Sequence, residues 1–225
     1  MLVSEFISRV NYALRGIDDE APSENNEEWA YWVSILNRKK DELYEDVTKR
    51  WSSVFDVRSL GTVSASSNPV YNIESANADF LAASDTAYVT TTEGQNVHFD
   101  FVKPAERNNK QEVYISGQNP QKLSFTQEIA ADSNLVGGTL YLPGYYLPAD
   151  VTDNSDVVPL PDANWGVMAV ASEIAFNDIV YEDKSSDINA KANNLYRLMV
   201  RKNKRGTFGS PRKTPIRINR VRSLE

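Results

Sequence analysis

The sequence has no cysteine and a single histidine, His98. Without cysteine, the chain can form neither a disulfide nor a thiolate metal site. It also lacks any run close to the roughly 20 apolar residues that a membrane-spanning helix needs, and it does not begin with a basic segment followed by an apolar core. We therefore expect no membrane segment and no standard secretion signal, and we expect assembly in cytoplasm.

Acidic residues are missing from one stretch, residues 188–224, which holds eleven Lys or Arg. Residues 1–187 hold the other 13 basic residues and 30 of the 31 acidic ones, so this part carries a formal charge of −17. A cationic segment of this kind binds anionic surface, which can be nucleic acid, membrane or an acidic protein.

Helical spacing of apolar residues predicts two helices in the first 53 residues, within a chain whose 41% hydrophobic content supports a sizeable core. The first runs from Leu2 to Leu14. The second is longer and keeps one apolar face from Trp29 to Trp51, over some seven turns.

The region 54–161 changes to short alternating runs separated by turn residues, which predicts strands. We expect a small sandwich or barrel here, with Leu60–Asp79 as a long loop and Gly117–Pro120 as a hairpin turn. The predicted strands are Ala87–Thr92, Val97–Val102, Glu112–Ser116, Lys122–Thr126 and Thr139–Leu142.

Helical spacing then returns. Pro161-Asp162 marks the start of a third helix, whose apolar face includes Trp165, Phe176 and Ile179, and Ser185 or Ser186 caps a fourth. The economical fold is α+β: residues 1–53 and 162–203 form a four-helix bundle from both chain ends, and the β-rich region 54–161 is inserted between its second and third helices.

Residues 204–225 contain glycines and prolines and no helical pattern, which predicts an extended, basic C-terminal arm. Fully extended, it would reach roughly 70 Å. Its alternating end is suited to adding as a strand to the sheet edge of another chain, with a disordered tail as the alternative. The candidate contact residues are Lys204, Arg205, Arg212, Lys213, Ile216, Arg217, Ile218, Arg220, Val221 and Arg222.

Patterns for catalysis, cofactors and metals are weak. His98 lies in a strand pattern without a nucleophile motif, and we expect it to be exposed. Asp150, Asp153 and Asp156 do not follow the spacing of a calcium loop, so they are better interpreted as turn carboxylates. The acidic segment 18–20 and the glycine pair 137–138 are interpreted as loop and turn, and the four tryptophans as core. We expect no enzyme, cofactor or metal site.

Four ordered segments carry a resemblance. They are Asn37-Arg38-Lys39-Lys40-Asp41-Glu42-Leu43, Tyr114-Ile115-Ser116-Gly117-Gln118-Asn119-Pro120, Leu142-Pro143-Gly144-Tyr145-Tyr146-Leu147-Pro148, and Trp165 leading into Ala171-Ser172-Glu173-Ile174-Ala175. Taken in this order over nearly the whole chain, they resemble the head-to-tail adaptor proteins of tailed bacteriophages.

The resemblance implies a structural virion protein in the neck between head and tail. Such adaptors form a ring, usually of twelve copies, which docks on the portal protein, contacts other neck or tail proteins, and lets double-stranded DNA pass through its bore without sequence-specific binding. Other neck or tail proteins, such as a tail terminator or a tail tubular protein, have similar composition. A nucleic-acid-binding module that uses the basic arm, and a tail-associated hydrolase, remain as alternatives from other classes.

Overall fold

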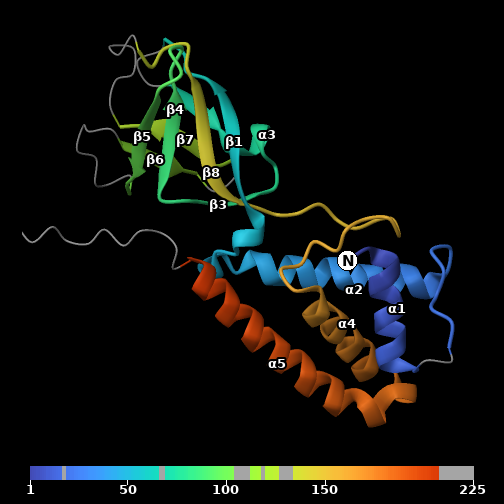
Figure 1. The fold of residues 1–225 in the computed structure, drawn as a ribbon. Coiled ribbons are helices and arrows are strands. Elements are labelled where there is room, and N and C mark those ends of the chain that lie inside the picture. Colours follow the sequence, from blue (N-terminus) through green and yellow to red (C-terminus); the bar gives the residue numbers. More distant parts are fainter. Residues whose placement is uncertain (17–18, 66–68, 104–111, 118–119, 127–133, 208–225) are drawn as a thin grey trace, which may run out of the picture.

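The computed structural model describes residues 1–225 except 17–18, 66–68, 104–111, 118–119, 127–133 and 208–225. The described chain forms a helical part from its two ends and a sheet from its middle (Figure 1). The α-helices are α1 (Val3–Leu14), α2 (Glu27–Glu45), α3 (Ile73–Ala76), α4 (Ala163–Asn177) and α5 (Glu182–Thr207). Short 3-10 helices are η1 (Val47–Lys49), η2 (Ser52–Val54) and η4 (Ile179–Tyr181).

The middle of the chain forms one eight-stranded sheet. Its order is β1-β8-β4-β5-β6-β7-β2, with β3 also paired to β8, and every pair is antiparallel except β5 with β6. The strands are β1 (Phe55–Thr62), β2 (Val70–Asn72), β3 (Phe80–Ala83), β4 (Thr86–Thr90), β5 (Asn96–Phe101), β6 (Glu112–Ser116), β7 (Lys122–Phe125) and β8 (Thr139–Tyr146). The sheet curls into a nearly closed barrel around a core that includes Val89, Phe99, Leu123 and Leu140.

The predicted four-helix bundle with an inserted β region is wrong. The described residues form five α-helices, and α1, α2 and α5 each pack on α4 far more than on one another. Figure 1 shows α2 running across α1 and α4 instead of alongside them. The reason lies in α4, which buries residues around most of its circumference, among them Trp165, Val167 and Val170. A helix that is apolar on nearly all sides takes a central position.

The second helix is shorter than predicted. It ends at Glu45, and the chain then makes the 3-10 turns η1 and η2, with a positive φ of 43° at Arg50 between them. Trp51 is still buried, and its indole Nε1 donates to the Leu43 carbonyl at 3.1 Å. The apolar spacing continues past the end of the helix because the 3-10 turns place Trp51 in the same cluster as Leu43 and Tyr44.

Strand predictions were accurate where apolar and polar residues alternate. The strand Glu112–Ser116 is confirmed as predicted, and the other four predicted strands coincide with β4, β5, β7 and β8 within a few residues. The predicted loop Leu60–Asp79 is wrong in part, because it contains the end of β1, β2 and α3. Most of β1 is exposed on both sides, so it lacks the alternation that marks a half-buried strand.

The helical part and the sheet meet at an apolar cluster that is separate from the core of the sheet. It joins Leu43 and Tyr44 of α2, Trp51 and Val54 of the 3-10 turns, Trp165 of α4 and Met199 of α5, and Tyr145 of β8 packs against it. Among the described residues, none of the helices combines the length and apolarity needed to cross a membrane.

Tyr146 at the end of β8 gives the sheet a testable pH dependence. Its hydroxyl donates to the Leu142 carbonyl at 2.7 Å, and burial raises its pKa to about 12. A raised pKa stabilises the folded state fully below the unfolded value near 10, and this contribution is lost as the pH rises through about 12. Between pH 8 and 11, we expect the wild-type chain to lose ~1.4 kcal/mol more stability than Tyr146→Phe, measured by urea unfolding. Equal losses in the two proteins would contradict the assignment.

Candidate functional site

The boundary between acidic and basic sequence lies within α5. Its first six residues include Glu182, Asp183 and Asp187, and every charged residue of the helix after Asp187 is basic. Acids at the start of a helix and bases at its end both complement the helix dipole, which makes this distribution favourable locally. After Asp187, the basic side chains of α5 that the structure shows as exposed are Lys191, Arg197, Arg201, Lys202 and Lys204.

Three of these cations form a row, which we call the basic row: Arg197, Arg201 and Lys204. Spacings of four and three residues place them on one side of the helix. Lys202 points elsewhere, because its Nζ lies 3.9 Å from Asp162 Oδ2 at the start of α4. The basic row therefore lies entirely on the folded helix α5, so the basic surface is not confined to the residues that follow this helix.

The predicted start of the C-terminal arm is wrong. Helix α5 extends to Thr207, so Lys204 and Arg205 belong to its last turns. The sequence did not predict a helix in residues 204–207, because Gly206 and the basic residues there form no apolar stripe. The other eight candidate arm residues lie outside the described part of the chain: Arg212, Lys213, Ile216, Arg217, Ile218, Arg220, Val221 and Arg222.

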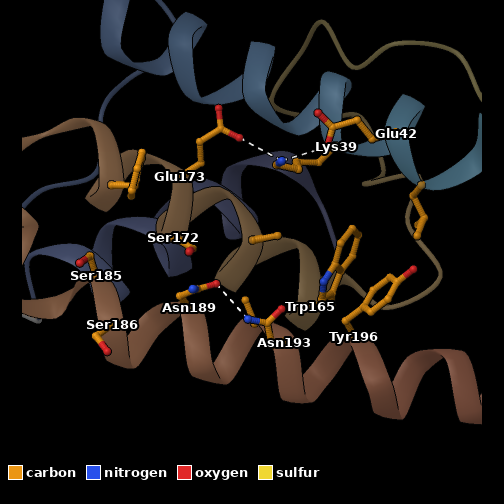
Figure 2. A pocket seen from close by; sticks show the side chains of 14 residues that line it. Lys39, Glu42, Trp165, Ser172, Glu173, Ser185, Ser186, Asn189, Asn193 and Tyr196 are labelled. Carbon is orange, nitrogen blue, oxygen red and sulfur yellow. Dashed lines mark hydrogen bonds and ion pairs between the residues drawn. The ribbon is translucent and has the colours of Figure 1, made fainter.

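A groove opens between α2, α4 and α5, with a volume of about 560 Å³ (Figure 2). Its apolar lining includes Leu43, Trp165, Ala169 and Ala192, and the Trp165 and Tyr196 rings pack with their centroids 5.8 Å apart. We call it the α2–α4–α5 groove. Its polar lining residues are Lys39, Glu42, Ser172, Glu173, Ser185, Ser186, Asn189 and Asn193.

Ion pairs and hydrogen bonds hold the walls of this groove in place. Lys39 Nζ lies 2.9 Å from Glu42 Oε2 and 3.1 Å from Glu173 Oε2, which joins α2 to α4 (Figure 2). On the α5 side, the Asn193 amide donates to Asn189 Oδ1 at 3.1 Å. The ion pair thus joins the α2 and α4 walls, whereas the Asn189–Asn193 bond lies within the α5 wall.

The far end of the groove is tied to the 3-10 turns by Lys49. Its Nζ donates to the Tyr196 hydroxyl and lies 2.8 Å from Asp46 Oδ2. The hydrogen bond to Asp46, followed by the one to Tyr196, raises the pKa of Lys49. Lys49 therefore keeps its charge at neutral pH and holds Tyr196 at the edge of the groove.

The turn between α4 and α5 exposes apolar side chains, contrary to the prediction that Phe176 and Ile179 belong to the packed face of the third helix. Phe176 and Ile179 are each 85% exposed and Val180 is 75% exposed. Helix α4 ends at Asn177, so Ile179 no longer follows its periodicity. We call Ile179 and Val180 the apolar turn, and the acidic residues Asp178, Glu182 and Asp183 surround it in sequence.

The other sequence candidates do not come together. His98 is exposed on β5, as predicted, with its ring 5.5 Å from that of Tyr88. Asp153 and Asp156 are turn carboxylates, also as predicted, since Asp156 Oδ2 accepts from the backbone N–H groups of Thr152 and Asp153. The hydrogen bonds from Ser155 lower the pKa of Asp153. No group of three or more His, Asp or Glu suited to a metal ion occurs within the described residues.

The tryptophans and the predicted turn segments can also be located in the structure. The four tryptophans are buried, as predicted, with exposed fractions of 1 to 8%. Gly137 lies in a turn before β8 with a φ of 85°, while Asp18 of the acidic segment lies outside the described residues.

The helical part thus has two notable surfaces: an apolar turn with acidic neighbours, and a groove beside a basic row. The sequence offered a signal for the basic row in its charge boundary. It offered none for the groove, which needs three separate helices. Comparison with known proteins adds no relative, since no protein-family model and no curated protein matches this chain.

Proposed function

We propose that this protein is a structural ring component of a tailed-phage virion, a head-to-tail adaptor that docks on the portal and connects capsid to tail. The observation that carries the proposal is the charge division: an acidic body ends in a folded basic row, and the basic sequence continues beyond it to residue 222. A body that repels phosphate and an end that binds acidic protein suit a connector through which DNA passes.

The resemblance noted in the sequence supports the same role and adds its details as part of the proposal. The ring would hold about twelve copies, lie in the neck of the virion, and contact other neck or tail proteins. Negative charge along the bore would let double-stranded DNA slide, whereas a wall rich in lysine would bind it through counterion release. Many copies of one basic segment would give avidity for the portal without a strong single contact.

Removal of residues 208–225 tests the proposal. We expect the shortened chain to remain folded, because the last residues that pack in a described core cluster are Met199 and Val200 of α5. We also expect it to lose binding to portal rings of its own virion in cosedimentation. A matched full-length variant with Arg212, Lys213, Arg217, Arg220 and Arg222 changed to Gln separates charge from strand pairing. Normal decoration of portal rings by the shortened chain would contradict the assigned role.

A nucleic-acid-binding module is the second candidate, and the basic row favours it because three exposed cations on one helix side suit a phosphate backbone. In that case affinity for random duplex DNA falls steeply between about 50 and 200 mM salt, and Arg197→Gln reduces that slope by about one. Absence of duplex binding at low salt would remove this candidate.

A further inference from the structure

The apolar turn is built to present its side chains outward. Tyr181 points inward, where its hydroxyl accepts from Arg15 Nε at 2.8 Å, and Lys184 Nζ donates to the Leu14 carbonyl at 2.8 Å. Asp178 Oδ1 accepts from the Val180 N–H at 3.0 Å. The turn is thus anchored to α1 on one side while Ile179 and Val180 stay exposed. Such preorganisation lowers the entropy cost of binding.

The chain cannot cover these side chains with its own α2–α4–α5 groove. Only residues 178–181 join α4 to α5, and these two helices form walls of the groove. Because the linker is that short, Ile179 and Val180 cannot fold back between the helices it connects. Within the described part of the chain, both the apolar turn and the apolar floor of the groove are therefore uncovered.

The apolar turn has acidic neighbours. The charged residues that line the groove, Lys39 with Glu42 and Glu173, form ion pairs with one another, and basic residues follow the groove along α5. Asp178, Glu182 and Asp183 lie next to the apolar turn, and Glu182 and Asp183 are exposed. The groove side of α5 is lined by Ser186 and Asn193, and Arg197 follows Asn193 by four residues on the same side of the helix. An acidic turn that enters the groove from outside would thus meet the basic row.

We propose that the apolar turn of one copy docks in the α2–α4–α5 groove of the next copy, with its acidic neighbours against Arg197 and Arg201. This inference rests on the proposed ring, and it names the contact between subunits. The contact is heterologous, since it uses two different surfaces of each copy, and repeated heterologous contacts close into a ring when the rotation allows. The groove, about 560 Å³ in volume, takes the two apolar side chains, and charge complementarity sets the orientation.

Two full-length variants, each altered on one surface only, test the contact. The turn variant is Ile179→Asp with Val180→Asp, and the groove variant is Arg197→Glu with Arg201→Glu. All four side chains are exposed, so we expect both variants to fold as the wild type does. By sedimentation velocity, each variant alone should self-associate at least tenfold more weakly than the wild type. Lys191→Glu is the matched control, because Lys191 lies on another side of α5, near Tyr12 of α1.

Mixing the two variants gives the decisive result. The turn variant keeps an intact groove and the groove variant keeps an intact turn, so an equimolar mixture should form dimers of one copy of each and nothing larger. Adding Glu182→Lys and Asp183→Lys to the groove variant should restore association by reversing both charges.

The outcomes separate this contact from the proposed function. If either variant forms rings as the wild type does, the contact is wrong while the ring stands. Failure of the mixture to form dimers, although each variant is dissociated, excludes a heterologous contact. If the wild type associates neither alone nor on portal rings, both the contact and the adaptor function are overturned.

Discussion

Replacement of Lys40 by alanine is expected to lower the free energy of unfolding by about 3 kcal/mol. Lys40 lies in α2 and is only 1% exposed, which is rare for a lysine. Its Nζ donates to the Pro148 carbonyl at 2.9 Å and to Asp150, and it lies 3.1 Å from Asp41 Oδ1. The carboxylates of Asp41 and Asp150 are themselves 40% and 63% exposed, so the expected loss comes mainly from the buried lysine stem, the Pro148 carbonyl left without its donor, and the one buried Asp41 oxygen.

A neighbouring lysine gives the matched control. Lys39 lies one position earlier in the same helix and also makes two ion pairs, but it is more exposed. We expect Lys39→Ala to cost less than about 1 kcal/mol, as partly exposed ion pairs do. Lys40→Met keeps the aliphatic volume and should fall between the two. Urea unfolding followed by tryptophan fluorescence measures all three, and similar losses at positions 39 and 40 would contradict a special role for Lys40.

Lys40 matters because it fastens the connection between the sheet and the helical part. After β8 the chain runs along α2 before it enters α4, and α2 side chains bind its backbone at several points (Figure 1). Asn37 both accepts from and donates to Val151, and the Tyr44 hydroxyl donates to the Pro159 carbonyl at 2.9 Å. A segment without regular structure of its own is thus held by helix side chains.

Helices and strands were predictable from the sequence where the spacing of apolar residues over a few neighbouring positions matches their burial. The helix Val3–Leu14 shows clear periodicity because one face is buried and the other exposed. The strand Glu112–Ser116 alternates in sequence, although only Val113 is buried and the other four residues are half-buried. Strand β1 shows no periodicity, since it is exposed along most of its length, and the apolar stripe that continued to Trp51 hid the end of α2. The spacing of apolar residues indicates which side chains are buried. It predicts the bounds of a helix or strand only when the buried stretch begins and ends with that helix or strand.

The candidate site depended even more on long-range packing. Counting charges along the sequence was enough to locate the basic row, because Arg197 and Arg201 follow Asp187, the last acidic residue before Glu225 at the end of the sequence. The exposure of Ile179 could not be predicted, because its apolar character equally suits a buried helix face. Lys40 lies in a run of charged residues, 38–42, and its burial depends on Pro148 and on Asp150, which follows 110 residues later.

Replacement of Val170 by aspartate is expected to have the largest effect on folding, a loss of more than about 4 kcal/mol. Val170 is fully buried in α4, at the centre of the cluster that α1 and α2 also enter. A carboxylate there would be surrounded by the apolar side chains of that cluster. The core of the sheet shares no residue with this cluster.

We therefore expect the aspartate variant to lose hydrogen-exchange protection in α1, α2 and α4 while β4 and β8 keep theirs, because each part has a core of its own. Val170→Ala is the matched control: it removes two methyl groups without adding charge and should cost about 2 kcal/mol. Simultaneous loss of protection in the sheet would mean that the cluster of Trp51, Trp165 and Met199 couples the two parts into one cooperative unit. In that case an assembly contact made through α5 would also stabilise the sheet, whereas separate unfolding confines its effect to the helices.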